Sequence, residues 1–229
     1  MATLIWDFDE TLAYRDGKWT RSMYEILVRN GYEHLSEDEV RPYFKSGLPW
    51  HRSNEAHMDY FVDEDWWTHI TEVIRLKLTQ LGFDEHQSRR LSGQFRAEYL
   101  DLSKWHLYED TLEALEFSVS EGHVNIILSN HVPELKDIVR NLGIDKYFQA
   151  IITSADVGYD KPHPAIYEEA LGHVEKGSRV YMIGDSYKAD VLGAMAMGID
   201  AIWVRQENLT DFVRHCEGLN GIWQFVDKR

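Results

Sequence analysis

The sequence has a single cysteine, Cys216, and comparatively few positive charges, and both shortages exclude classes of protein. One cysteine cannot form a disulfide within the chain, which fits a reducing compartment, and we therefore expect a cytoplasmic protein. Lysine and arginine number 24 against 39 aspartate and glutamate residues, so the formal net charge is −15. The longest basic run is Arg89 and Arg90. Because nucleic-acid binding needs clustered positive charge, we expect no nucleic-acid partner.

Long apolar runs are also missing. No stretch approaches the roughly twenty apolar residues that a membrane-spanning helix needs. The N-terminus lacks the basic and then apolar pattern of a secretory signal, so we expect no membrane partner. The chain does have 229 residues, of which 44% are hydrophobic. This is enough for a sizeable core in one large domain or in a domain with an insertion.

The spacing of apolar residues changes along the chain. Residues 3–7 predict a short buried strand, whereas the spacing over 20–102 is helical throughout and is typical of a small bundle. Beyond that point strands alternate with helices, which favours a parallel sheet in a three-layer α/β sandwich. The predicted strands there are VNIIL, AIIT, RVYMI and AIWV, at residues 124–128, 150–153, 179–183 and 201–204. We therefore predict a Rossmann-like α/β core of residues 1–14 and 104–229, interrupted by a helical insertion of residues 15–103.

Acidic residues follow two of the predicted strands. Asp7 ends the first strand and Asp9 lies two positions later, while Gly184 and Asp185 end a later strand and are followed by Asp190. The carboxyl ends of parallel strands are where open α/β sheets bind ligands. Carboxylates held close together repel one another unless a cation or a shared proton offsets their charge. The pattern therefore predicts a site that needs a positive partner.

Magnesium fits this pattern better than calcium. An EF-hand loop starting at Asp7 would need glycine at its sixth position and glutamate at its twelfth. The sequence has Leu12 and Lys18 at those positions. Mg²⁺ takes one or two carboxylates and keeps other positions for water and phosphate oxygens. The two strand ends therefore make a plausible magnesium site.

Two further stretches could bind an anion. Ser129 and Asn130 follow a strand and precede a helix, whose first N–H groups favour negative charge, although either residue could simply be a helix cap. Lys161 lies between a strand and a helix that Pro164 is expected to open. A lysine in a loop is usually solvated. Beside three carboxylates, however, it would offset their charge and hold a phosphate oxygen.

These four stretches, in this order, resemble the motifs of the haloacid dehalogenase superfamily of phosphotransferases. Asp7–Thr11 matches its Asp-x-Asp-x-Thr motif, and Ser129 and Lys161 match its second and third motifs. Gly184–Asp190 matches the fourth, Gly-Asp-x-x-x-x-Asp. The helical insertion lies where this superfamily places a cap of the first type.

The resemblance implies a catalytic role for two aspartates. Asp7 would be the nucleophile that attacks phosphorus and forms an aspartyl phosphate. Asp9 would be the general acid that protonates the leaving alkoxide, and then the base that activates water. The implied Mg²⁺ ligands are Asp7, Asp9 through its backbone carbonyl, and Asp185.

The remaining motif residues have supporting roles in the resemblance. Ser129, Asn130 and Lys161 would hold the phosphoryl oxygens. Thr11 would support the turn after the nucleophile, and Asp190 would orient Lys161 or a bound water.

Asp9 also indicates which branch of the superfamily the chain resembles. Haloacid dehalogenases need no acid for their leaving group and lack this aspartate. The resemblance therefore implies a Mg²⁺-dependent phosphatase similar to phosphoglycolate phosphatase-like proteins, a monomer or homodimer acting on a small phosphorylated metabolite. Two alternatives stay open. A sugar phosphomutase would use the same aspartate pair, and a catalytically silent binding or regulatory domain could share the scaffold.

Glu10 departs from the family pattern, which usually has glycine at this position. The motif Asp-x-Asp-Glu-Thr resembles that of phosphatases that act on phosphoserine in RNA polymerase tails. Those enzymes lack a large helical insertion, so a small metabolite remains the expected substrate.

The insertion is expected to set substrate specificity. In similar caps a loop between two helices reaches the leaving group, and here that loop contains Trp50, His51 and Arg52. Arg52 would bind a second anionic group, and Trp50 or His51 would cover the substrate, although the loop could equally be an ordinary helix connection. Trp66 and Trp67 follow a helical stripe and are expected in the core of the insertion.

Overall fold

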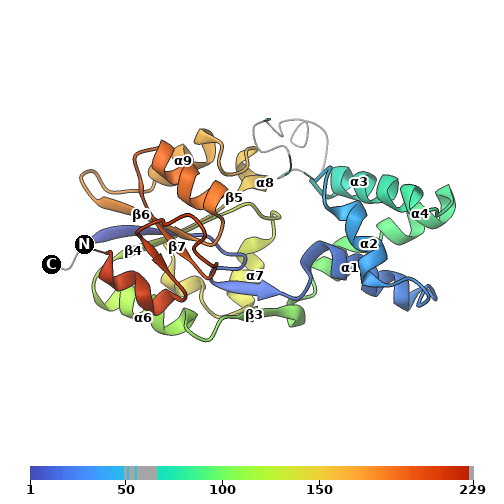
Figure 1. Ribbon diagram of the computed structural model, residues 1–229, viewed down its shortest axis with the longest axis horizontal. Coiled ribbons are helices and arrows are strands. Elements are labelled where there is room, and N and C mark those ends of the chain that lie inside the picture. The colour runs from blue at the N-terminus through green and yellow to red at the C-terminus, as the bar shows by residue number, and fades with distance from the viewer. Residues whose placement is uncertain (49–50, 52–54, 56–65, 227–229) are drawn as a thin grey trace. The chain divides into compact units, whose positions relative to one another are not determined.

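The structure is a computed structural model, and it describes residues 1–48, 51, 55 and 66–226 (Figure 1). The chain divides into two compact units. One contains the described residues of Met1–Tyr14, Ser53–Ala56 and Trp105–Arg229, and we call it the core unit. The other contains those of Arg15–Arg52 and His57–Lys104, and we call it the insertion unit.

Among the described residues, the core unit holds a six-stranded sheet in the order β5-β4-β1-β6-β7-β8. Its strands are β1 (Ala2–Trp6), β4 (Val124–Ser129), β5 (Ala150–Thr153), β6 (Arg179–Gly184), β7 (Asp200–Val204) and β8 (His215–Cys216). Neighbouring strands are parallel throughout, and Ile5 of β1 lies opposite both Ile126 and Met182. Every residue of β1 is buried, as expected for a strand with both faces covered. The predicted α/β class with a parallel sheet is confirmed.

Helices cover both faces of this sheet, with α6 and α9 on opposite sides (Figure 1). The helices of the core unit are α6 (Thr111–Ser120), α7 (Leu135–Asn141), α8 (Ser154–Val157), α9 (Pro164–Leu171) and α10 (Gly193–Ala196). Helical segments of other types are η4 (Asp145–Tyr147), η5 (Tyr187–Leu192) and η6 (Leu219–Gln224). Ile166 and Tyr167 of α9 pack with Ile126, Leu128 and Met182 in an apolar cluster. This packing fixes the strands whose ends carry the predicted site.

The described part of the insertion unit is helical and has its own aromatic core. Its helices are α1 (Lys18–Arg29), α2 (Glu37–Phe44), α3 (Trp66–Gln80), α4 (Glu85–Ser92) and α5 (Phe95–Tyr99). The Trp19 ring lies 5.2 Å from Phe95 and 4.7 Å from Tyr99, measured between centroids. Its centroid is also 6.2 Å from that of Trp66 and 6.4 Å from that of Trp67. The tryptophan pair therefore lies in the core of this unit, as its helical spacing predicts.

A charge cluster joins the two ends of the insertion unit. Glu98 is buried, and its carboxylate accepts hydrogen bonds from Arg15 at 3.2 Å and from Arg29 at 2.7 Å. Lys104 donates to Glu98 as well, and to Glu25 at 2.6 Å. Because Arg15 and Lys104 are the first and last residues of the unit, this cluster fastens its two chain ends to α1 and α5.

Short strands β2 (Ala13–Arg15) and β3 (Trp105–Leu107) form a separate two-stranded sheet, and η3 (Leu102–Lys104) precedes β3. In the part of the chain that the structure describes, no helix has the length and apolar character needed to cross a bilayer.

Candidate active site

The site begins at the carboxyl ends of three neighbouring strands. Asp7 directly follows β1, Ser129 is the last residue of β4, and Asp185 directly follows β6. Asp7 still belongs to the hydrogen-bonded ladder, because its N–H donates to the carbonyl of Ile183 at 2.9 Å. Since β1 lies between β4 and β6, the sheet itself brings the three side chains to one place.

A buried lysine lies between two carboxylates in this site. The Lys161 ammonium donates to Asp7 Oδ1 at 2.8 Å and to Asp190 Oδ1 at 2.6 Å. Ser129 Oγ donates to the same Asp7 oxygen at 2.9 Å. Burial alone would lower the pKa of Lys161, but the charges of Asp190 and Asp7 outweigh it and raise the pKa. Lys161 is therefore a fixed positive charge beside Asp7.

Gly184 permits the tight turn that returns Asp190 to the site. A Cβ atom at Gly184 would lie 2.3 Å from the carboxyl carbon of Asp190, so any other residue would clash. Ser186 donates its backbone N–H to Asp190 Oδ2 at 2.9 Å. Both Asp190 oxygens therefore accept hydrogen bonds, one from Lys161 and one from this turn.

Three carboxylates gather where a metal ion was expected. Asp7, Asp185 and Asp190 each offer one oxygen, and these oxygens lie within 4.8 Å of one another. Hard carboxylate oxygens are the donors that Mg²⁺ prefers, so the residues present fit a divalent cation. Because Asp190 already accepts from Lys161 and Ser186, Asp7 and Asp185 are better placed to be direct ligands.

Asp185 is held from the neighbouring strand. The indole N–H of Trp203 donates to the backbone carbonyl of Asp185 at 2.7 Å. The Gln206 amide donates to Asp185 Oδ2 at 3.3 Å. Both donors come from β7 or the loop after it, and they orient the backbone and the side chain of Asp185.

The Asn130 side chain contacts the loop that carries Lys161. Its amide donates to the backbone carbonyl of Lys161 at 3.0 Å and accepts from the Lys161 N–H at 2.6 Å. This reciprocal pair holds the loop that carries Lys161. A contact between Asn130 and a phosphoryl oxygen would therefore come from its backbone.

Asp9 lies in a tight turn after β1. The N–H groups of Leu12 and Ala13 both donate to the carbonyl of Phe8, at 3.0 and 3.1 Å, and Glu10 donates to Ala13 at 2.8 Å. Thr11, which the sequence predicted to support this turn, is fully buried, and its N–H donates to Phe8 at 3.3 Å. The turn sets the position of the Asp9 carboxylate relative to Asp7.

His131 is a neighbour of Asp9 that the sequence did not reveal. Its Nε2 atom lies 3.9 Å from Asp9 Oδ1, and its side chain is fully buried. The His131 ring packs against Phe8 and Trp105, with centroids 5.6 and 5.3 Å away. Its place directly after Ser129 and Asn130 was the one signal that could have marked it.

The predicted specificity loop is described only in part. Trp50 and Arg52 lie outside the described residues. His51 is exposed in the insertion unit, and its Nδ1 atom accepts from the Leu48 N–H at 3.1 Å.

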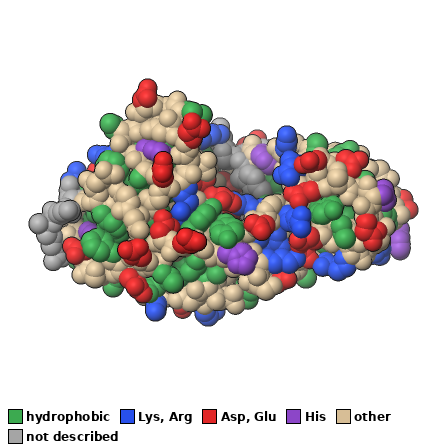
Figure 2. Space-filling view, turned by 60° about the horizontal axis from the view of Figure 1, so that its bottom comes forward, with side chains coloured by type: hydrophobic (Ala, Val, Ile, Leu, Met, Phe, Trp, Pro, Cys, Tyr) green, Lys and Arg blue, Asp and Glu red, His purple; other side chains and the backbone are tan. Residues whose placement is uncertain are grey.

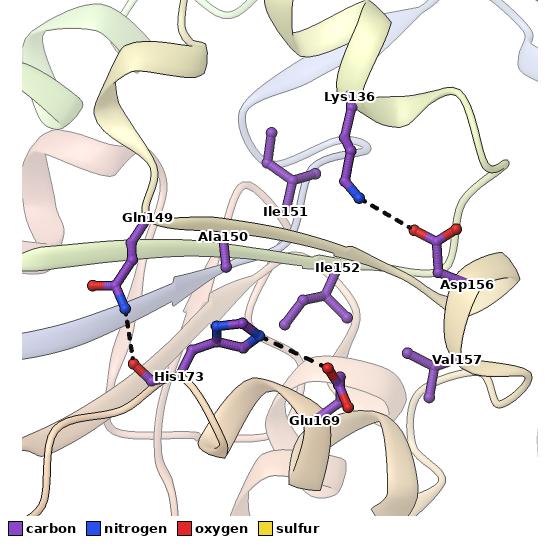
Figure 3. A pocket seen from close by; sticks show the side chains of 9 residues that line it. All are labelled: Lys136, Gln149, Ala150, Ile151, Ile152, Asp156, Val157, Glu169 and His173. Carbon is purple, nitrogen blue, oxygen red and sulfur yellow. Dashed lines mark hydrogen bonds and ion pairs between the residues drawn. The ribbon is translucent and has the colours of Figure 1, made fainter.

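A separate hollow of about 670 Å³ lies at the β5 edge of the sheet (Figure 3). Its polar side chains contact one another. Lys136 lies 3.8 Å from Asp156, and His173 lies 3.8 Å from Glu169. The carboxylate cluster does not line this hollow, so we do not assign it to the candidate site.

Comparisons with known proteins identify relatives of this chain. A bovine protein named haloacid dehalogenase-like hydrolase domain-containing protein 3 is 29% identical over 146 residues, which are 62% of this chain and 57% of that protein. Glyceraldehyde 3-phosphate phosphatase of Methanothermobacter thermautotrophicus is 34% identical over 118 residues, 50% of this chain and 51% of that protein. The chain thus matches little more than half the length of these two relatives.

A solved structure shares the fold over nearly the whole chain. The HAD-hydrolase YfnB of Bacillus subtilis, described as bound to magnesium, superposes with a TM-score of 0.72 at 17% identity, and covers 98% of this chain and 97% of that one. The family model described as haloacid dehalogenase-like hydrolase matches residues 1–198. The chain therefore belongs to the haloacid dehalogenase-like hydrolase family, as its four motifs predicted.

Proposed function

We propose that this chain is a Mg²⁺-dependent phosphatase that hydrolyses a phosphomonoester through an aspartyl phosphate on Asp7. The observation that carries the proposal is the placement of Asp7. Its carboxylate lies beside the Lys161 ammonium and the Ser129 hydroxyl, and in one cluster with Asp185. A relative whose name is that of a phosphatase supports the same activity.

In the first step an Asp7 carboxylate oxygen attacks phosphorus and forms an aspartyl phosphate. The bond between phosphorus and the leaving oxygen breaks, and Asp9 gives its proton to the departing alkoxide. In the second step Asp9 takes a proton from water, which attacks the same phosphorus. The bond to Asp7 breaks, inorganic phosphate leaves, and both aspartates return to their starting states.

The cations of the site offset charge during these steps. A Mg²⁺ ion held by Asp7, Asp185 and the Asp9 carbonyl would neutralise phosphoryl charge as a Lewis acid. Lys161 would move one of its hydrogen bonds from Asp7 to a phosphoryl oxygen while Asp190 keeps the ammonium in place. Ser129 would donate its hydroxyl to a second phosphoryl oxygen.

We propose a small phosphorylated metabolite as the substrate, with specificity set by the insertion unit. The loop with Trp50, His51 and Arg52 would contact the leaving group, and Arg52 would bind a second anionic group if the substrate has one.

The proposal is tested by offering the purified protein phosphorylated sugars, phosphoglycolate and nucleotides, with Mg²⁺ or with EDTA. We expect phosphate release that requires Mg²⁺ and falls by about 10³-fold or more in Asp7→Asn, as when other covalent nucleophiles are removed. Asp137→Asn is the matched control, because Asp137 is an exposed aspartate paired with Arg140.

Each other outcome points to one of the alternatives. An isomerised sugar phosphate without phosphate release would indicate a phosphomutase. Absence of turnover with every substrate, in wild type as in Asp7→Asn, would favour a binding or regulatory domain.

A further inference from the structure

Glu10 has a backbone conformation that glycine would adopt more easily. Its φ angle is +61°, in the left-handed region. A side chain in this region costs about 1–2 kcal/mol relative to glycine. The family usually has glycine here, so the backbone alone does not explain a glutamate.

The Glu10 side chain has a partner that compensates for this cost. Glu10 Oε2 accepts a hydrogen bond from the Tyr108 hydroxyl at 2.6 Å. A short hydrogen bond to a carboxylate is about twice as strong as one between neutral groups. Burial raises the pKa of Tyr108, and Glu10 raises it further, so the phenol remains a donor.

Tyr108 is itself held in place by a second residue that reaches the same turn. The Arg205 guanidinium lies 3.8 Å from the centroid of the Tyr108 ring. Arg205 Nε donates to the backbone carbonyl of Thr11 at 2.7 Å, and the guanidinium also donates to Asp110 at 2.5 Å. The turn is therefore held at two residues, by Tyr108 at the Glu10 side chain and by Arg205 at the Thr11 backbone.

We infer that Glu10, Tyr108 and Arg205 are positioning residues that hold the turn carrying Asp9, and so set the geometry of proton transfer to the leaving group. This inference rests on the proposed function, in which Asp9 is the general acid. Tyr108 contacts the Glu10 side chain, which is one residue from Asp9, and Arg205 contacts the carbonyl of the next residue, Thr11. A displacement of the turn would move the Asp9 carboxylate, whereas Asp7 is anchored separately in the sheet.

The test compares two leaving groups in Tyr108→Phe and Glu10→Gly. The first variant removes the hydroxyl and keeps the ring under Arg205, and the second keeps the left-handed turn and removes the carboxylate. An alkyl phosphate needs a proton from Asp9 as its oxygen leaves, while p-nitrophenyl phosphate needs much less help. The quantity to measure is kcat/KM, because it reports the steps up to departure of the leaving group.

We expect kcat/KM for the alkyl phosphate to fall by about tenfold in each variant, equivalent to about 1.4 kcal/mol of transition-state stabilisation. The value for p-nitrophenyl phosphate should change less than about twofold. The double variant should lose no more than either single one, since both remove the same hydrogen bond. Tyr147→Phe is the matched control, because it removes another Tyr–Glu hydrogen bond, to Glu116, in the same unit.

The outcomes separate this inference from the proposed function. Equal losses with both substrates, or variants that behave as Tyr147→Phe does, would overturn the positioning role while leaving the phosphatase proposal intact. A wild-type protein that hydrolyses neither substrate would overturn the phosphatase proposal, and this inference with it.

Discussion

At the scale of single residues, the site depends on one buried positive charge. Lys161 is 3% exposed, and the Asp190 side chain that it contacts is 1% exposed. Charges this far from water are tolerated only when they are paired, because the loss of hydration is otherwise not offset. Lys161 therefore stabilises the fold, in addition to the phosphate-binding role proposed for it.

Replacement of Lys161 by methionine should show this stabilising role. We expect Lys161→Met to lower the free energy of unfolding by about 3–5 kcal/mol in EDTA, because Asp7 and Asp190 stay buried without their cation. Urea denaturation at neutral pH measures the change. Lys136→Met is the control, since Lys136 forms an exposed pair with Asp156 at 3.8 Å and should lose less than about 1 kcal/mol. A similar loss in both variants would argue against the buried pair.

At the scale of elements, the strands that carry the site were the most predictable part of the fold. VNIIL, AIIT, RVYMI and AIWV became β4, β5, β6 and β7, because buried parallel strands are continuous apolar runs. The two residues of β8 and the three-residue strands β2 and β3 are too short to give such a signal.

The residues of the site also differ in how well the sequence predicts their positions. Asp7, Ser129 and Asp185 lie at strand ends, so topology alone brings them together. Tyr108 and Arg205 lie far apart in the sequence, and only tertiary packing brings Tyr108 to Glu10 and Arg205 to Tyr108 and Thr11. The Asn130 side chain likewise contacts the Lys161 backbone across two loops, which no local pattern encodes.

The charge cluster of the insertion unit should make α1 sensitive to acid. Burial alone would raise the pKa of Glu25, but hydrogen bonds from Lys104 and Arg21 outweigh it and lower the pKa from 4.5 to about 2. A lowered pKa in the folded state stabilises the fold above the unfolded value of 4.5, and this contribution disappears as the pH falls toward 2.

Glu25→Gln should therefore destabilise the protein at neutral pH and much less in acid. We expect a loss of about 1 kcal/mol at pH 7, after allowance for solvent screening of this partly exposed group. Urea denaturation of both proteins at several pH values between 7 and 3 should show the difference shrinking below about pH 4.5. A difference that does not vary with pH would contradict the ion-pair explanation. In a Lys104→Met background the substitution should have a smaller effect.

At the scale of the whole molecule, the net charge of −15 gives every added cation some stabilising effect. On the face shown in Figure 2, lysine and arginine side chains lie among aspartate and glutamate side chains. Added salt screens such exposed charges, whereas a bound ion stabilises the folded state in proportion to its occupancy. The two effects can be separated at constant ionic strength.

Magnesium should raise the unfolding temperature beyond the effect of matched sodium chloride. At a hundredfold excess over Kd, binding adds about 2.7 kcal/mol, which corresponds to about 5–10 °C for a chain of this size. Asp185→Asn should abolish the difference between the two salts, because it removes a proposed ligand. An equal response to both salts in the wild type would mean that the carboxylate cluster binds no magnesium.

The central place of β1 also determines when the protein can become active during its synthesis. Trp6 pairs with Ile127 and Ile183, so this strand leaves the ribosome long before either neighbour exists. Its apolar side chains must avoid aggregation while more than half of the chain is still being translated. Strand pairings between such distant segments also form slowly. No shorter nascent chain holds the complete cluster, because Ser129 and Lys161 can reach Asp7 before β6 has emerged, whereas Asp185 and Asp190 follow that strand.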